Sequence, residues 1–213
     1  MNAVPSEEEM RNALYERHGR ELQDRFFNSV VAVCGLGGLG SNIAISLARA
    51  GVGTLILIDF DKVDITNLNR QQYKARQIGT YKTDALRENI MEVSPYISLI
   101  THTVKISDEN IVELLSNADI ICEAFDQADE KSMLVNGVLE KLPGKDIVSA
   151  SGMAGIGSPN TIRTRRIGKH FYLCGDGVSD VKDTIGLLSS RVMLCAAHQA
   201  HTVLQIIADK IEL

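Results

Sequence analysis

The stretch that decides the fold is VVAVCGLGGLGSNIAISLARAGVGTLILID, residues 30–59. It begins with a continuous apolar run at 30–34, which is typical of a strand buried on both faces. After a glycine-rich turn, apolar residues recur at helical spacing over 43–50. A second apolar run at 54–58 ends at Asp59. This order predicts one strand–helix–strand unit.

The same alternation continues along the chain. Strands that alternate with helices predict an α/β fold, with a doubly wound, mostly parallel, Rossmann-like sheet and helices on both faces. After Gly157 the pattern changes to a hairpin followed by a long apolar helix. The further helices expected are 80–94, 108–115, 129–142 and 187–211; the further strands are 97–104, 120–125, 147–150, 161–166 and 170–173.

A chain of 213 residues is long enough for one domain with a sizeable core. We expect a single domain over 1–213, and the first helix should begin at a capping box of Ser6 and Glu9. The expected parts are a helical arm over 1–28, a nucleotide-binding core over 29–157, and the hairpin with the C-terminal helix over 158–213.

The composition excludes several functional classes. Hydrophobic residues make up 45% and charged residues 23%, which rules out disorder as the main state. The net charge of −5 provides no basic excess for binding DNA. No apolar run approaches the roughly 18 residues of a membrane span. The acidic start MNAVPSEEEM is unlike a secretory signal.

The four cysteines favour a reducing, cytoplasmic location. They are far apart and form no CxxC pair, so they fit neither a disulfide framework nor a zinc cluster. They are Cys34, Cys122, Cys174 and Cys195.

The glycine turn between the first strand and helix predicts a nucleotide site. Gly35, Gly37 and Gly40 form GxGxxG, with an additional Gly38. Glycines allow the backbone to approach a phosphate, and the helix N-terminus supplies free N–H groups. Asp59, at the end of the next strand, can accept hydrogen bonds from ribose hydroxyls. The alternative is that tight strand–helix packing alone requires the glycines.

Residues on both sides of this strand–helix–strand unit argue against simple dinucleotide binding. They include IDFDKVDITNLNRQ (58–71), Gly79 with Lys82, and the early YERHGRE (15–21). Together with GLGGLGS (35–41), this sequence resembles the ThiF/MoeB family, adenylyltransferases that are related to the ubiquitin-activating enzymes. The resemblance covers the chain from about Tyr15 onward, and it is strongest to the short ThiF-type proteins.

The resemblance implies a reaction between ATP and a protein carboxylate. In that family, ATP and Mg²⁺ activate the C-terminal carboxylate of a small ubiquitin-like sulfur carrier ending in Gly-Gly, which gives an acyl-adenylate and pyrophosphate. A carboxylate is already ionised at pH 7, so the reaction needs no general base. It needs cationic groups and a metal, because an anion must approach a polyanion.

The resemblance also implies roles for individual residues. Asp59 corresponds to the ribose-binding acid, Asn67 and Arg70 to groups at the phosphates, Lys82 to the phosphate lysine and Asp126 to the acid that holds Mg²⁺. Alternatively, the two cations are solvated, and Asp126 only caps a helix. The implied catalytic residues are Arg17, Arg70, Lys82 and Asp126; the implied nucleotide-binding residues are Gly35, Gly37, Gly38, Gly40, Asp59, Asp61, Asn67, Arg70, Lys82 and Gln127.

Arg17 corresponds to an arginine that reaches the ATP site of the neighbouring subunit, which implies a homodimer. A different register would assign this role to one of the nearby arginines, Arg11, Arg20 or Arg25. The alternative is a surface ion pair with an adjacent glutamate.

The sequence departs from the family pattern in two places. Many relatives carry two CxxC pairs that bind zinc, and only Cys174 of the first pair is present, so we expect no zinc. His198 and His201 lack a third ligand partner. The stretch SDVKDTIGLLSS contains no cysteine, and Cys195 should be buried and inert. We therefore expect no covalent thiol intermediate, with sulfur delivered by a separate donor protein.

The leading hypothesis is adenylylation of a ThiS-like sulfur carrier. The basic hairpin, with Arg163, Arg165, Arg166 and Lys169, could bind an acidic carrier or simply be solvated. Other acceptors within the class are a molybdopterin-type carrier and a tRNA carboxylate. An NAD-dependent oxidoreductase and a non-catalytic dimeric adaptor belong to different classes, and the oxidoreductase gives no role to the cations after Asp59.

Overall fold

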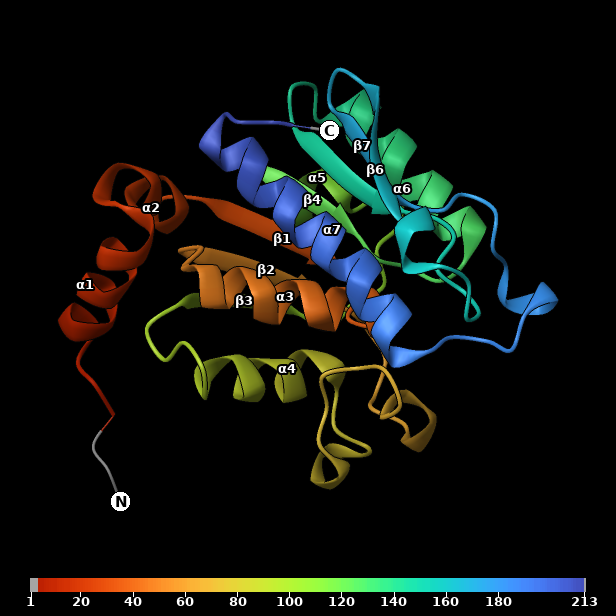
Figure 1. Cartoon of the computed structure of the whole chain (residues 1–213), viewed down its shortest axis with the longest axis horizontal. Coiled ribbons are helices and arrows are strands. Elements are labelled where there is room, and N and C mark those ends of the chain that lie inside the picture. The colour runs from red at the N-terminus through yellow and green to blue at the C-terminus, as the bar shows by residue number, and fades with distance from the viewer. Residues whose placement is uncertain (1–3, 213) are drawn as a thin grey trace.

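The computed structural model describes residues 4–212 and is built on a seven-stranded sheet (Figure 1). The strand order is β3-β2-β1-β4-β5-β7-β6, and all neighbours are parallel except the antiparallel pair β6 and β7. The strands are β1 (Val30–Cys34), β2 (Thr54–Ile58), β3 (Ser98–His102), β4 (Ile120–Glu123), β5 (Asp146–Ala150), β6 (Arg163–Gly168) and β7 (Phe171–Gly175).

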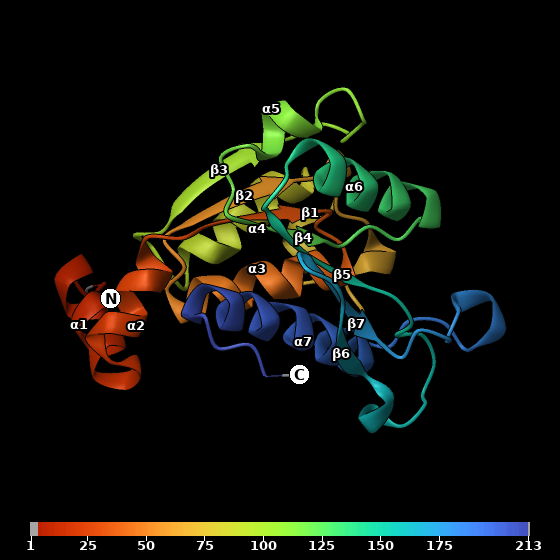
Figure 2. The same cartoon turned by 90° about the horizontal axis from the view of Figure 1, so that it is seen from above.

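Helices cover both faces of the sheet (Figures 1 and 2). The helices α3, α4 and α7 pack on one face, and α5 and α6 pack on the other. The helices are α1 (Glu7–His18), α2 (Arg20–Phe27), α3 (Gly38–Ala50), α4 (Lys82–Met91), α5 (Ile111–Leu115), α6 (Ala128–Lys141) and α7 (Ser189–Ala208); short 3-10 turns are η1 (Ile65–Asn67), η2 (Ala75–Gln77), η3 (Pro159–Thr161) and η4 (Val181–Asp183).

The apolar runs of the sequence are buried on both sides, as the strand period requires. Val31 and Val33 of β1 belong to the core under α3, α4 and α7. Ala32 and Cys34 point the other way, into the core under α5 and α6. This arrangement confirms the predicted doubly wound α/β fold.

The strand order reverses between β1 and β4. The chain proceeds outward from β1 to β2 and β3, and then returns to build β4 and β5 on the other side. Open α/β sheets bind ligands at such a switch point, because the loops that follow the two central strands diverge there.

The predicted hairpin exists but is part of the main sheet. Strand β7 pairs with β5 in parallel, with Ile147 opposite Phe171, and leaves β6 at the edge. The local pattern predicted the two strands but not this insertion, because a distant pairing partner leaves no signal in the hairpin's own residues.

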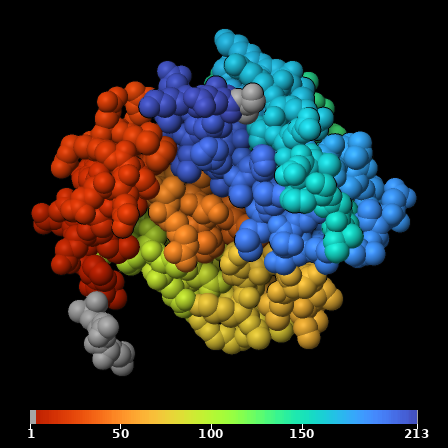
Figure 3. Space-filling view, in the orientation of Figure 1, coloured from red at the N-terminus to blue at the C-terminus, as the bar shows by residue number. Residues whose placement is uncertain are grey.

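The N-terminal arm of α1 and α2 lies beside the amino ends of the strands. Its predicted capping box is confirmed, since the Ser6 hydroxyl accepts the N–H of Glu9 and the Glu9 carboxylate accepts the N–H of Ser6. The arm forms one end of the molecule, and the segment 176–188 lies at the other (Figure 3). Within residues 4–212, no helix has the length and apolar character needed to span a membrane.

Candidate functional site

A cavity of about 690 Å³, here called the central cavity, opens where the carboxyl ends of β1, β2 and β4 meet. It lies at the switch point of the sheet, as expected for an α/β nucleotide site. Of the site residues expected from the sequence, all but Gly40 and Arg17 line it.

The glycine turn that borders the central cavity uses its glycines for two different purposes. Gly35 has a φ of +88°, and a Cβ on Gly40 would lie 1.8 Å from the Gly35 carbonyl oxygen. Both positions therefore need glycine for the fold itself. A Cβ on Gly37 would meet only the Gln71 amide nitrogen, at 3.8 Å. Gly37 faces open space in the central cavity, where a ligand can approach the backbone.

Asp59 is held rigidly beside this turn. Its carboxylate accepts the backbone N–H of Leu36 at 2.6 Å and that of Asp61 at 2.7 Å, and the residue is 8% exposed. Burial raises the pKa of Asp59, against the lowering effect of the Lys82 charge and the two backbone hydrogen bonds. The oxygens are thus anchored by backbone donors at the edge of the cavity.

Lys82 begins α4 and is buried, which excludes the interpretation of a solvated helix residue. Its Nζ lies 2.7 Å from the Asp61 carboxylate and 3.7 Å from that of Asp59. The side chain lines the central cavity. A strongly anionic ligand would compete with Asp61 for this ammonium group.

Arg70 lies in the loop between β2 and α4, on the same side of the cavity. Its guanidinium donates to the Thr66 carbonyl at 3.0 Å and to the Asn69 amide oxygen at 2.8 Å. No carboxylate between residues 4 and 212 forms an ion pair with it. Its positive charge is therefore available to a ligand. Asn67 lines the same wall, and its side-chain oxygen accepts the Asp64 N–H.

Asp126 and Gln127 face this wall from the loop between β4 and α6. Gln127 occupies the N-cap position of α6, and no side chain caps that helix. The Asp126 carboxylate is exposed and lines the cavity, so the helix-cap interpretation is not supported. In the described part of the chain, no group of three or more His, Cys, Asp or Glu is placed to hold a metal. One carboxylate suits Mg²⁺, which keeps water and phosphate oxygens as its other ligands.

Two further features, one that lines the central cavity and one beside it, were missed by the sequence analysis. Gln71 is 8% exposed and lines the cavity, and its amide oxygen has no hydrogen-bond partner in the described structure. Glu123, at the end of β4, is fully buried and paired with Lys131, whose Nζ lies 3.1 Å from both carboxylate oxygens. Glu123 stands in an apolar strand and Lys131 in a polar helix turn, so neither residue stands out in the sequence.

The Glu123–Lys131 pair supports the loop that carries Asp126. Glu123 also accepts the backbone N–H of Phe125 at 2.7 Å and the hydroxyl of Ser149. Lys131 donates to the Ala150 carbonyl at 3.0 Å. The ends of β4 and β5 are therefore joined at the cavity floor by a satisfied ionic network.

Arg17 lies in α1, apart from the central cavity. Of the four arginines considered for its role, three have partners: Arg11 stacks 4.5 Å from the Phe27 ring, Arg20 stacks 4.1 Å from the Tyr15 ring, and Arg25 binds Glu21. Arg17 makes no such contact in the described structure, and the surface ion pair considered as the alternative is not formed there.

All four cysteines are buried and free. Burial and the neighbouring Cys174 raise the pKa of the Cys195 thiol to about 12. The structure confirms that Cys195 is buried, and a thiol with so high a pKa is a poor nucleophile at neutral pH.

A second cavity of about 710 Å³, here called the side cavity, lies next to the central one. Arg163 and Arg165 of β6 line it, whereas Arg166 turns to the Tyr172 ring at 5.6 Å. Ala154 and Ser179 line both cavities. The basic hairpin thus directs only part of its charge toward this side of the site.

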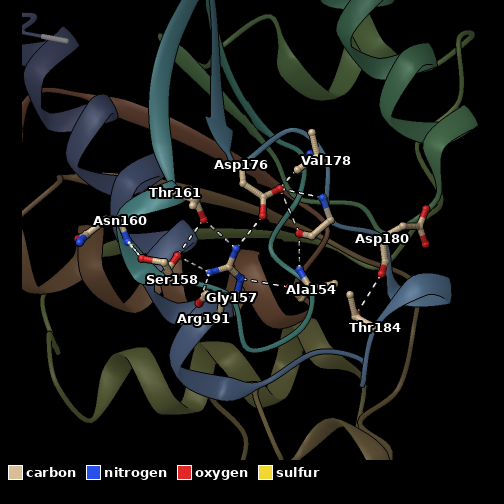
Figure 4. Close-up of polar contacts among 11 residues, drawn as sticks. Ala154, Gly157, Ser158, Asn160, Thr161, Asp176, Val178, Asp180, Thr184 and Arg191 are labelled. Carbon is tan, nitrogen blue, oxygen red and sulfur yellow. Dashed lines mark hydrogen bonds and ion pairs between the residues drawn. The ribbon is translucent and has the colours of Figure 1, made fainter.

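Arg191 binds the loops around the side cavity (Figure 4). Its guanidinium donates to the carbonyls of Ala154, Gly157 and Ser158 at 2.9–3.1 Å and to the Thr161 hydroxyl at 3.1 Å. It also forms an ion pair of 2.7 Å with Asp176. We call these residues, with Ser179, the Arg191 cluster.

The stability of the protein should depend on pH through Asp176. Burial raises the pKa of Asp176, but hydrogen bonds from Ser179, Val178 and Arg191 outweigh it and lower the pKa to about 2. Because this lies below the value of about 3.9 for an unfolded chain, the carboxylate contributes about 2 kcal/mol above pH 4. That contribution is lost as the pH falls toward 2.

Urea unfolding of the wild type and Asp176→Asn between pH 7 and pH 3 measures this contribution. The wild type should be the more stable protein at pH 7, and the difference should shrink below pH 4. A difference that stays constant over this range would show that the carboxylate charge is not responsible.

The fold and the cavity at its switch point define a doubly wound α/β domain of the kind that binds ligands at the carboxyl ends of its strands. The family model described as the ThiF family matches residues 10–213. The chain therefore belongs to the ThiF family.

Named relatives and solved structures are similar to this chain. The chain is 34% identical to adenylyltransferase and sulfurtransferase MOCS3 of Caenorhabditis briggsae over 60% of this chain and 32% of that protein. It is 34% identical to the probable adenylyltransferase/sulfurtransferase MoeZ of Mycobacterium tuberculosis, over 65% of this chain and 37% of that one. It thus spans about a third of these relatives' length. The tRNA N6-threonylcarbamoyladenosine dehydratase TcdA of Escherichia coli, solved with ATP, has the same fold, with a TM-score of 0.86, 20% identity and coverage of 97% and 98% of the two chains.

Proposed function

We propose that this chain is an ATP-dependent adenylyltransferase that activates the C-terminal glycine carboxylate of a small ubiquitin-fold sulfur carrier, most like ThiS. One observation carries the proposal. Arg70, Lys82 and Asp126 converge on one cavity beside an anchored acid and a glycine turn. A cavity with this combination suits a triphosphate and a divalent cation. The names of the curated relatives agree with an adenylyltransferase.

The residues divide the reaction between them. Asp59 would bind the ribose hydroxyls, and the backbone at Gly37 would lie against the phosphates. Arg70 and Lys82 would neutralise charge as the acceptor carboxylate attacks the α-phosphorus and pyrophosphate leaves. Asp126 would hold Mg²⁺, which supplies charge neutralisation at the phosphate oxygens. The attacking carboxylate is already ionised, so no residue has to remove a proton.

Arg17 fits this reaction only in a homodimer. It is exposed on α1, it forms no ion pair with any residue between 4 and 212, and it does not line the central cavity of its own chain. In a dimer, Arg17 would complete the phosphate site of the partner subunit. The four buried thiols suit a reducing cytoplasm, and a separate donor protein would supply sulfur after adenylylation.

ATP–pyrophosphate exchange tests the proposal. Label should pass from pyrophosphate into ATP only with Mg²⁺ and a carrier that ends in Gly-Gly, and a carrier lacking its last glycine should be inactive. A molybdopterin-type carrier and a tRNA with a carboxylate-bearing base serve as the other acceptors. The net charge of −5 disfavours tRNA.

NADH oxidation without exchange would instead identify an oxidoreductase. Nucleotide binding without exchange with any acceptor would indicate an adaptor.

The two kinds of turn glycine predict opposite outcomes on substitution. Gly37→Ala should fold like the wild type but bind ATP more weakly, by about tenfold, because the new methyl group occupies the side where phosphate would approach. Gly40→Ala should be strongly destabilised, because its methyl group collides with the Gly35 carbonyl. Thermal unfolding and ATP titration separate the two effects. Equal loss of stability in both variants would contradict this division.

A further inference from the structure

Arg191 occupies a position that is unfavourable for a cation. It is the third residue of α7, where the helix dipole disfavours positive charge, and it is 7% exposed. A buried guanidinium is tolerated only when its donors are satisfied. Its guanidinium donates to five groups, and these hydrogen bonds satisfy its donors (Figure 4).

These contacts join two loops that are far apart in the sequence. One loop, 151–162, follows β5, and the other, 176–188, follows β7. Arg191 holds the first through backbone carbonyls and the second through Asp176. The second Asp176 oxygen accepts the N–H groups of Val178 and Ser179, and the Ser179 hydroxyl accepts the N–H of Ala154 at 3.1 Å.

The joined loops form the wall between the two cavities, since Ala154 and Ser179 line both. The glycine turn, Asp59 and Lys82 line the same cavity, but they belong to elements other than these two loops. If the nucleotide binds against them, as the proposed function requires, this wall is left to guide the acceptor. The rim of the side cavity carries the exposed apolar residues Ile156 and Ile185, which suit an extended peptide better than a solvated loop.

We propose that Arg191 is a positioning residue for the acceptor. Through Asp176 and Ser179, Arg191 fixes the two loops that form the wall. The chain end of the acceptor lies against this wall when its carboxylate meets the α-phosphate. The inference rests on the proposed function. It assigns Arg191 an effect on acceptor binding that is separate from nucleotide binding. Within residues 4–212, no hydrogen bond or ion pair of the Arg191 cluster reaches the glycine turn, Arg70 or Lys82.

The test measures the KM for the carrier and the KM for ATP in the exchange reaction. Arg191→Met should raise the carrier KM by about tenfold and leave the ATP KM within about twofold. Arg191→Lys should recover part of the loss, because an ammonium group can still pair with Asp176. Arg87→Met is the matched control, since Arg87 is an exposed α4 residue outside both cavities.

A milder variant keeps the test decisive if Arg191→Met does not fold. Ser179→Ala removes the hydroxyl's hydrogen bonds with the Ala154 N–H and the Asp176 carboxylate, and keeps the Arg191–Asp176 ion pair. It should raise the carrier KM by about threefold with an unchanged ATP KM. Equal increases in both KM values, or a fall in kcat alone, would overturn the positioning role while leaving the proposed function intact. No exchange by the wild type with any acceptor would reject the proposed function, and this inference with it.

Discussion

Replacing Arg70 with alanine should lower the rate of ATP–pyrophosphate exchange by a factor on the order of 10²–10³, the usual cost of removing one pre-positioned charge-stabilising group. Arg70 lines the central cavity, and no carboxylate among the described residues 4–212 pairs with it, so its charge is available to the phosphates. The loss should appear mainly in kcat, because charge accumulates on the phosphates as pyrophosphate leaves. Stability should change little, since the guanidinium's hydrogen bonds to Thr66 and Asn69 are exposed and lie within its own loop.

Arg76→Ala is the matched control for this prediction. Arg76 lies in the same connection between β2 and α4, but it pairs with Glu88 and Glu92 at the surface and does not line the central cavity. It should keep nearly full activity. If Arg70→Ala binds ATP and still exchanges pyrophosphate at the wild-type rate, the proposed mechanism is wrong.

Replacing Lys131 with methionine should destabilise the protein by about 3–5 kcal/mol, the usual effect of leaving a buried charge without its partner. The charge left behind is Glu123, which is fully buried. Its remaining donors, the Phe125 N–H and the Ser149 hydroxyl, do not neutralise it. Urea unfolding at neutral pH measures the loss.

Two controls separate the buried charge from the substitution itself. Lys141→Met changes the same residue type on the same helix, but Lys141 pairs with the exposed Asp108 and should lose only about 0–1 kcal/mol. Adding Glu123→Gln to Lys131→Met removes the unpaired charge and should restore much of the stability. A double variant no more stable than the single one would show that the lysine acts through packing rather than charge.

Much of the fold could be predicted from the sequence because its signals are local. The run at 30–34 and the glycine turn each depend on neighbouring residues, and the structure places a strand and a helix start there. The place of β7 between β5 and β6 could not be predicted, because it depends on pairing between residues that are distant in the chain. Element ends also shifted by a few residues: the helix expected over 80–94 is Lys82–Met91.

The site divides in the same way. Asp59, Arg70, Lys82 and Asp126 were predicted to lie at a nucleotide site, and all line one cavity, because motif residues follow strands whose carboxyl ends meet there. Arg191 escaped the sequence analysis: it stands in an apolar helix, and its partners come from loops remote in the chain. Buried polar residues are recognised only once the fold shows what surrounds them.

The two roles of the glycines in the turn bear on how such proteins diverge. A descendant that lost its activity would still need glycine at positions 35 and 40, because the surrounding backbone leaves no room for a Cβ there. Position 37 would be released from selection as soon as the ligand was gone. Among descendants of this chain, the residue at position 37 should therefore distinguish proteins that still bind the ligand from proteins that have lost it.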